Sequence, residues 1–131
     1  DGSVTLRPAD AEIHGGVRVE QSGGKDNIGF WVNKDDFVTW KFKVTKPGKF
    51  DVEMDIACKA GSEGSEYTVS IGAESVKDAV ESTGQWQSYK TKKSGSISIA
   101  EAGRVELAGK ALSKKGEGVM NLRSVTLKPV K

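Results

Sequence analysis

The sequence is poor in the residues that disulfide-stabilised proteins and many enzymes rely on, with one cysteine and one histidine in 131 residues. A single cysteine, Cys58, forbids a disulfide within the chain, and its even spacing after a row of apolar residues predicts a small buried side chain. No apolar run approaches the length of a membrane span, so we expect no membrane partner. The chain begins at Asp1 rather than Met, and we expect a processed product or a piece excised from a larger protein.

Catalytic motifs are missing as well. His14 follows Ile13 and precedes a glycine pair, without a serine or cysteine nucleophile motif, so it is expected at the surface or at a sheet edge. No Cys/His set has the spacing of a zinc site, and no glycine-rich phosphate loop is present. The adjacent acids Asp35 and Asp36 fit a loop-to-strand turn as well as a calcium site. The sequence therefore predicts a protein that is not an enzyme, with no catalytic residue, metal site or cofactor.

The chain also has little excess of either positive or negative charge. The chain has 20 Lys and Arg against 18 Asp and Glu, which leaves a formal net charge of +2. This balance gives no reason to expect nucleic acid or an anionic membrane surface as a partner. A chain of this length builds one hydrophobic core, so we expect a single domain over residues 1–131. We also expect the domain to be a monomer.

The dominant hydrophobic period is two, which is typical of β-strands. Apolar and polar residues alternate from Val38 to Val44, and again from Phe50 to Cys58 after a turn at residues 46–49. We expect these two runs to form a long hairpin, with lysines of the first strand opposite acidic residues of the second.

Further short alternating runs are separated by glycine-rich turns. The segment from Ala73 to Val80 fits either one helical turn or a short strand. About nine or ten short strands with such connections predict an all-β fold, an antiparallel β-sandwich of the jelly-roll type. The other expected strands are Val4–Leu6, Val17–Val19, Ile28–Phe30, Tyr67–Ile71, Tyr89–Lys92, Ile97–Ile99, Val105–Leu107 and Val119–Lys128.

Aromatic residues are few, and five of them lie between positions 30 and 42. Trp40 fits the apolar face of its strand and is expected in the core. Trp31 lies in a polar loop with no obvious core to enter, but it adjoins Phe30, and one of these two neighbours is expected to be buried. Trp86 lies in a second polar loop, where it either caps the sandwich or faces solvent. An exposed ring beside polar side chains suits a sugar, because the ring covers C–H groups while its neighbours bind hydroxyls.

Five features follow one another along the chain: Ala9–Val17, Ile28–Trp31 with Asp36–Val38 after it, Val44–Phe50, Thr83–Tyr89 and Asn121–Leu127. They include a glycine followed by two aromatic residues at positions 29–31 and a Thr-Gly-Gln-Trp loop at 83–86. In this order and spacing they resemble carbohydrate-binding modules of families 6 and 35, which are galactose-binding-like jelly rolls. The stretch from Asn27 to Trp31 is also similar to accessory domains of bacterial fucosidases and sulfatases.

The resemblance implies a sugar site in a cleft formed by loops at one end of the sandwich, with the concave face of a sheet as the alternative location. The aromatic residue after the glycine, here Phe30 or Trp31, would clasp the sugar ring together with Trp86 of the later loop. Asn121 before the last strand would hydrogen-bond hydroxyl groups, and Glu20 in an early strand would help. These five are the expected carbohydrate-binding residues.

One part of the family pattern is missing. These families usually hold a structural calcium through two glutamates of the opening strand and an aspartate of the last strand, and the matching positions here are Arg7, Ala9 and Arg123. Because two positive charges replace negative ones, we expect the calcium site to be lost. An arginine there needs an acidic partner, for which Asp10, Glu12 or another nearby acid is expected.

The resemblance implies a non-catalytic module that targets a linked glycan-degrading enzyme to its polysaccharide, in a bacterial protein that is secreted, extracellular or periplasmic. Tethering of this kind raises the local concentration of substrate at the catalytic domain. Arg18, Arg123 and the many lysines leave room for an anionic glycan, sulfated or uronic. Two alternatives stay open, namely a structural sandwich that packs on a catalytic or adhesion domain without binding sugar, and a small hydrolase.

Overall fold

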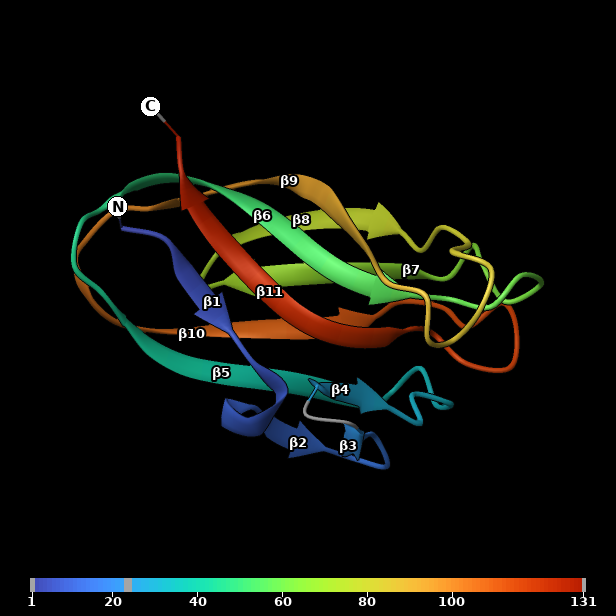
Figure 1. The fold of residues 1–131 in the computed structure, drawn as a ribbon. Coiled ribbons are helices and arrows are strands. Elements are labelled where there is room, and N and C mark those ends of the chain that lie inside the picture. The colour runs from blue at the N-terminus through green and yellow to red at the C-terminus, as the bar shows by residue number, and fades with distance from the viewer. Residues whose placement is uncertain (1, 23–24, 131) are drawn as a thin grey trace.

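The computed structural model describes residues 2–22 and 25–130, and these form eleven strands in two antiparallel sheets packed face to face (Figure 1). The predicted all-β sandwich is confirmed, with slightly more strands than expected. The only helical turn of the described part is η1, a 3-10 helix over Pro8–Asp10. The strands are β1 (Val4–Leu6), β2 (Glu12–His14), β3 (Arg18–Ser22), β4 (Lys25–Gly29), β5 (Phe37–Val44), β6 (Gly48–Ala57), β7 (Glu66–Ile71), β8 (Glu74–Ala79), β9 (Lys90–Ile99), β10 (Gly103–Ala111) and β11 (Asn121–Pro129).

The two sheets enclose one core. The six-stranded sheet has the order β3-β4-β11-β6-β9, with β1 also paired to β11, and the five-stranded sheet has the order β2-β5-β10-β7-β8. Along β6 and β7 every second side chain is buried, as the period of two predicts. Trp40 and Cys58 are both buried in the core, which confirms their expected places.

The two strands expected to form one hairpin lie in different sheets, so that prediction is wrong. β5 pairs with β2 and β10, whereas β6 pairs with β9 and β11. An alternating strand buries its apolar face equally well in either sheet, so alternation alone does not select its neighbours. The outward charges follow the real pairing: Lys41 lies 3.5 Å from Glu12 on β2, and Asp51 lies 3.2 Å from Lys93 on β9.

Two further segments differ from the sequence-based expectation. The runs expected as separate strands at 89–92 and 97–99 belong, apart from Tyr89, to one strand, β9, which stays paired with β6 across a register shift between Val52 and Glu53. Gly95 at this irregularity has a φ of +152°, and a Cβ there would lie 3.0 Å from a methyl group of Val76. The segment that fitted either a helical turn or a strand contains β8.

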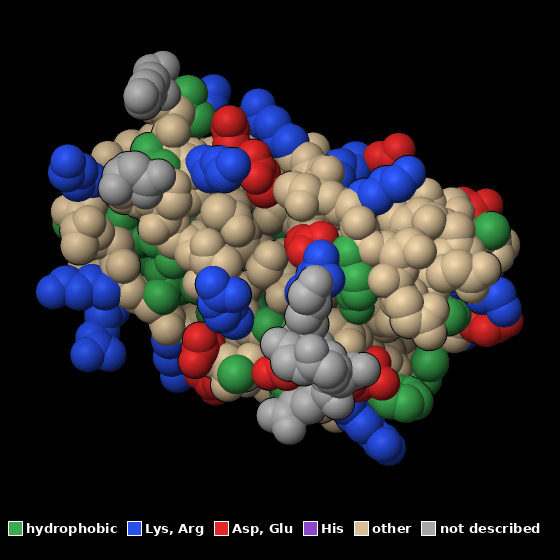
Figure 2. Space-filling model, in the orientation of Figure 1, with side chains coloured by type: hydrophobic (Ala, Val, Ile, Leu, Met, Phe, Trp, Pro, Cys, Tyr) green, Lys and Arg blue, Asp and Glu red, His purple; other side chains and the backbone are tan. Residues whose placement is uncertain are grey.

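The loops that follow β4, β6, β8 and β10 gather at one end of the sandwich (Figure 1). Figure 2 shows Lys and Arg side chains spread over one face of the molecule with acidic side chains among them, rather than gathered in one basic patch. In the part of the chain that the structure describes, no helix is long and apolar enough to span a membrane.

Candidate functional site

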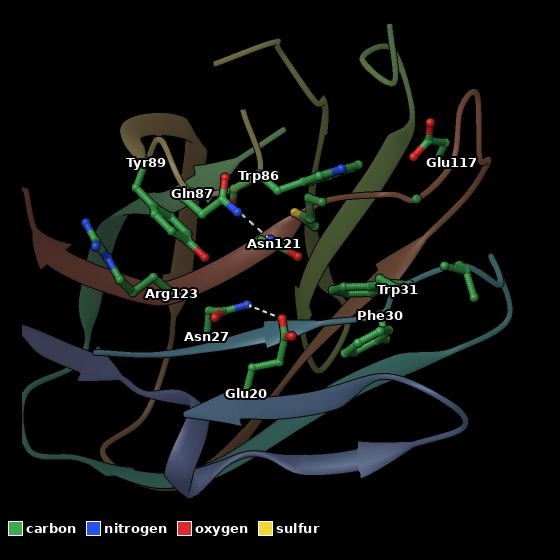
Figure 3. Close-up of a pocket in the computed structure, with 13 residues that line it drawn as sticks. Glu20, Asn27, Phe30, Trp31, Trp86, Gln87, Tyr89, Glu117, Asn121 and Arg123 are labelled. Atoms are coloured by element: carbon green, nitrogen blue, oxygen red, sulfur yellow. Dashed lines mark hydrogen bonds between the residues drawn. The ribbon is translucent and has the colours of Figure 1, made fainter. Parts of the chain in front are cut away.

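A pocket of about 620 Å³ opens at the end of the sandwich where these loops meet. Its walls come from β3, β4 and the start of β11, and from the loops after β4, β8 and β10. The five residues expected from the sequence all line it (Figure 3): Glu20, Phe30, Trp31, Trp86 and Asn121. Segments far apart in the chain therefore contribute to one concave site.

The adjacent rings of Phe30 and Trp31 occupy different environments. Trp31 is only 1% exposed, and its indole Nε1 donates a hydrogen bond to the carbonyl oxygen of Asp36 at 3.1 Å. The expectation that this loop tryptophan has no core to enter is therefore wrong. The expectation that one of the neighbours Phe30 and Trp31 is buried is confirmed. Phe30 is 53% exposed and has a φ of +56°, a left-handed conformation that is uncommon outside glycine. The chain turns at this residue, so that one ring points outward and the next packs inward.

Glu20 is held in one orientation by its neighbours on the β3–β4 hairpin. It is the register partner of Asn27, whose Nδ2 donates to the Glu20 Oε1 at 2.9 Å (Figure 3). A Cβ at Gly29 would lie 1.9 Å from the same oxygen, so the carboxylate occupies the space that a side chain there would fill. The hydrogen bond uses Oε1, which leaves Oε2 for another partner.

The opposite wall contains Tyr89 and Arg123. The Arg123 Nε donates to the Asp55 Oδ2 at 2.8 Å, and its guanidinium carbon lies 4.3 Å from the centre of the Tyr89 ring. The acid beside Arg123 is thus Asp55 of β6 rather than Asp10 or Glu12. Burial raises the pKa of Tyr89 to about 12, with Arg123 opposing the shift and Glu20 and Asp55 adding to it. Tyr89 therefore keeps its proton at neutral pH and remains a hydrogen-bond donor.

Backbone and amide hydrogen bonds join the loops around the pocket. The Asn121 Nδ2 donates to the carbonyl oxygen of Trp86 at 2.9 Å, and the amide of Val119 donates to the carbonyl oxygen of Trp31 at 2.7 Å. A Cβ at Gly118 would lie 3.3 Å from that Trp31 oxygen and 3.6 Å from the Trp86 ring. The Trp86 side chain is half-buried against the core, so both packing and hydrogen bonds position its loop.

A second set of contacts anchors the loop that precedes β11. Ser62 and Ser65 are buried, and their hydroxyl oxygens accept hydrogen bonds from the amides of Glu117 at 3.2 Å and Lys115 at 3.0 Å. Gly116 lies between these two amides, and a Cβ there would lie 2.4 Å from the Ser62 Cα. This close approach positions Glu117 and Gly118 in the pocket wall.

Sequence reasoning missed several lining residues, among them Asn27, Gln87, Tyr89, Glu117 and Arg123. The sequence predicts Tyr89 in a strand. It predicts Arg123 at the missing calcium site and among the cations that leave room for an anionic glycan, but it does not predict either residue in the lining of the pocket. Two signals could have found some of them: Arg123 follows Asn121 by two positions, and Asn27 pairs across the hairpin with Glu20. Within the described residues, no group of three or more His, Cys, Asp or Glu side chains is placed to hold a metal ion.

Chemically, the pocket combines aromatic rings with fixed polar groups. Phe30, Trp86 and Tyr89 supply apolar surface, with the buried Trp31 behind it, while carboxylate, amide and hydroxyl groups surround them. A lining of this kind is chemically suited to a ligand that has both C–H faces and many hydroxyl groups.

The family model described as "Domain of unknown function (DUF5077)" matches residues 16–131. No curated protein matches the chain in sequence. One similar solved structure is the C-terminal family 6 carbohydrate-binding module of LamC, a marine laminarinase from Zobellia galactanivorans, with a TM-score of 0.78, 17% identity, and 96% of this chain and 98% of that chain covered.

Two others support the same fold. The module CBM6cm-2 from Cellvibrio mixtus lichenase 5A, solved with cellotriose, has a TM-score of 0.76 and 21% identity over 98% of both chains. A family 35 carbohydrate-binding module from Clostridium thermocellum has a TM-score of 0.76 and 14% identity, with 99% of this chain and 100% of that chain covered. At these identities the likeness shows the fold, and it confirms the jelly roll of the family 6 and 35 type.

Proposed function

We propose that this chain, which belongs to the DUF5077 family, is a non-catalytic carbohydrate-binding domain. One observation carries the proposal: the pocket joins rings from two separate loops to polar side chains that are already held in place by hydrogen bonds. A rigid site of this kind loses little entropy when it binds, which suits a ligand as well hydrated as a sugar.

In the proposed binding mode a pyranose ring lies between the Phe30 and Trp86 rings. Phe30 offers the more exposed ring, and Trp86 is held by Asn121 from the opposite side of the pocket (Figure 3). Trp31 contributes as a buried wall rather than as a stacking face. The Oδ1 of Asn121 and the Oε2 of Glu20 would accept hydrogen bonds from sugar hydroxyls.

The domain would act by targeting. Two of the similar structures are modules of a laminarinase and a lichenase, and a small pocket of modest affinity is useful when it is tethered to a catalytic domain. We therefore propose a linked glycan-degrading enzyme as the partner, in a bacterial protein that is secreted, extracellular or periplasmic, with this domain as a monomer. The expectation of an anionic glycan stays untested, and a lining with Glu20 and Glu117 beside the single cation Arg123 favours the opposite.

A packing role is the second candidate function. Phe30 and Val32 are both more than half exposed beside the pocket, and a neighbouring domain would cover such an apolar rim. In that case the pocket would be closed by protein and would bind no sugar.

A glycan array and a pull-down on insoluble polysaccharides test the proposal, with wild type beside Trp86→Ala and Phe37→Ala. Phe37 is the control because its ring stacks on His14 on the five-stranded sheet, outside the pocket lining. Binding that is lost in Trp86→Ala and kept in Phe37→Ala is the expected result. The opposite pattern would move the site to the sheet face, and a folded wild type that binds no glycan would leave the packing role.

A further inference from the structure

The basic group of the pocket is already engaged. Arg123 is the one lysine or arginine in the described lining. Its guanidinium is paired with Asp55, whose side chain is only 18% exposed, and it also covers the Tyr89 ring. An anionic sugar would have to compete with a carboxylate that is already 2.8 Å from the Arg123 Nε. A second cation, Arg18, has its guanidinium carbon 5.1 Å from the Phe30 ring centre but does not line the pocket.

Carboxylates outnumber cations in the same site. Glu20 and Glu117 both line the pocket, and Asp55 stands beside Arg123. The Glu20 carboxylate helps to raise the pKa of Tyr89, so the negative charge of Glu20 acts on the opposite wall of the pocket. A group that enters between these walls therefore meets a net negative environment, since Arg123 is offset by its own partner.

The geometry makes Glu20 the group that a cation would meet. The hydrogen bond from Asn27 holds its carboxylate in the pocket (Figure 3), and the missing side chain of Gly29 leaves room for it there. Oε2 is left for a ligand. Aromatic faces also attract an ammonium group, and the Trp86 ring lines the same pocket, whereas the Phe30 ring already has the Arg18 guanidinium carbon 5.1 Å from its centre. A pyranose that carries an amino group thus finds an apolar surface for its ring and a carboxylate for its charge.

We propose that this pocket selects glycans by charge and prefers those with a free amino sugar over those with carboxylate or sulfate groups. The inference rests on the proposed carbohydrate-binding function and names its ligand class. Glu20 is the specificity-determining residue, and neutral sugars bind with an affinity between those of the amino sugars and the anionic sugars.

The test compares glycans with a free amino sugar, their N-acetylated forms, neutral glycans, and uronic or sulfated glycans on one array. Wild type is measured beside Glu20→Gln, which keeps the size of the side chain and an oxygen for Asn27. Glu106→Gln is the matched control, because Glu106 is an exposed glutamate of β10 outside the pocket. We expect free-amine glycans to bind about fivefold to tenfold more tightly than their N-acetylated forms, as a single charged hydrogen bond allows. Glu20→Gln should remove this preference and Glu106→Gln should keep it.

The outcomes separate the two proposals. Stronger binding of uronic or sulfated glycans by wild type would overturn the charge selection and leave carbohydrate binding intact. A free-amine preference that is absent in wild type, or that persists in Glu20→Gln, would also overturn it. No binding to any glycan would refute the proposed function, and the charge selection with it.

Discussion

Phe30 and Trp31 are neighbours in the chain, yet Trp31 is 1% exposed in the core and Phe30 is 53% exposed at the pocket. The left-handed backbone at Phe30, with a φ of +56°, produces this division. One residue therefore contributes mainly to stability and the next mainly to the binding surface.

Replacing each residue in turn should separate the two roles. Trp31→Ala removes a fully buried ring and its hydrogen bond to Asp36, so we expect a loss of about 3–5 kcal/mol in the free energy of unfolding. Phe30→Asn removes an exposed ring and adopts the left-handed backbone readily, so stability should change by less than about 1 kcal/mol while glycan affinity falls. Urea denaturation and glycan binding, measured on both variants, check this. A stable Trp31→Ala, or an unstable Phe30→Asn, would contradict the division.

Gly29→Ala should move Glu20 without changing any charge. The added Cβ would lie 1.9 Å from the Glu20 Oε1, and the flexible end of the glutamate gives way more easily than the backbone. We expect a small effect on stability and a loss of the free-amine preference, as in Glu20→Gln. Gly109→Ala is the control, because its Cβ makes ordinary contact with Val38 at 3.5 Å. An unchanged preference in a folded Gly29→Ala would show that the position of the Glu20 carboxylate is unimportant.

Two different properties of the sequence predicted the fold and the pocket: hydrophobic alternation predicted the sandwich, and the family resemblance predicted the residues that meet in the pocket. Alternation reports which face of a strand is buried. This held for β6 and for Val38, Trp40 and Val44 of β5, but Thr39, which the alternation places on the outward face, is also buried. The pocket residues came from a resemblance whose segments kept their order, and all five line one pocket. Their role in binding sugar stays a prediction.

Strand partners and loop paths could not be read from the sequence. The patterns of β5 and β6 are equally compatible with one sheet or two, because each carries one apolar and one charged face. The burial of Trp31 depends on long-range contacts, since the amide of Val119 donates to its carbonyl oxygen from another loop. Neither the strand pairing nor this hydrogen bond between loops leaves a local signal in the sequence.

Gly116→Ala should loosen the loop before β11. Its Cβ would lie 2.4 Å from the Ser62 Cα, which is backbone that has little room to yield, so we expect a cost of about 1–3 kcal/mol. The amides of Lys115 and Glu117 should then exchange hydrogen faster, because they lose their bonds to Ser65 and Ser62. Glycan affinity should fall with them. Native-state hydrogen exchange measures this, and unchanged protection of both amides would refute the anchoring role.

Alkaline pH should destabilise the fold through its two tyrosines. The pKa of Tyr67 and that of Tyr89 are both raised from 10.0 to about 12, chiefly by burial. Because the folded state holds these protons more tightly than the unfolded state, their contribution to stability is fully present below pH 10 and is lost as the pH rises through 12. Lys92 acts in the same direction: burial lowers its pKa, but Glu81 and Asp78 raise it above the ordinary value.

The measurement uses the fact that the chain contains only two tyrosines. Ultraviolet absorbance of tyrosinate then reports Tyr67 and Tyr89 alone, and in the folded protein it should rise at higher pH than in urea. The urea midpoint should fall between pH 10 and 12 in wild type and fall less in Tyr89→Phe, which keeps the ring under Arg123. Tyr67→Phe should show the same flattening, together with a loss of stability at neutral pH because its hydroxyl bonds Ser94 at 2.6 Å. Tyrosine titration near pH 10 in the folded protein would show that burial does not protect these hydroxyls.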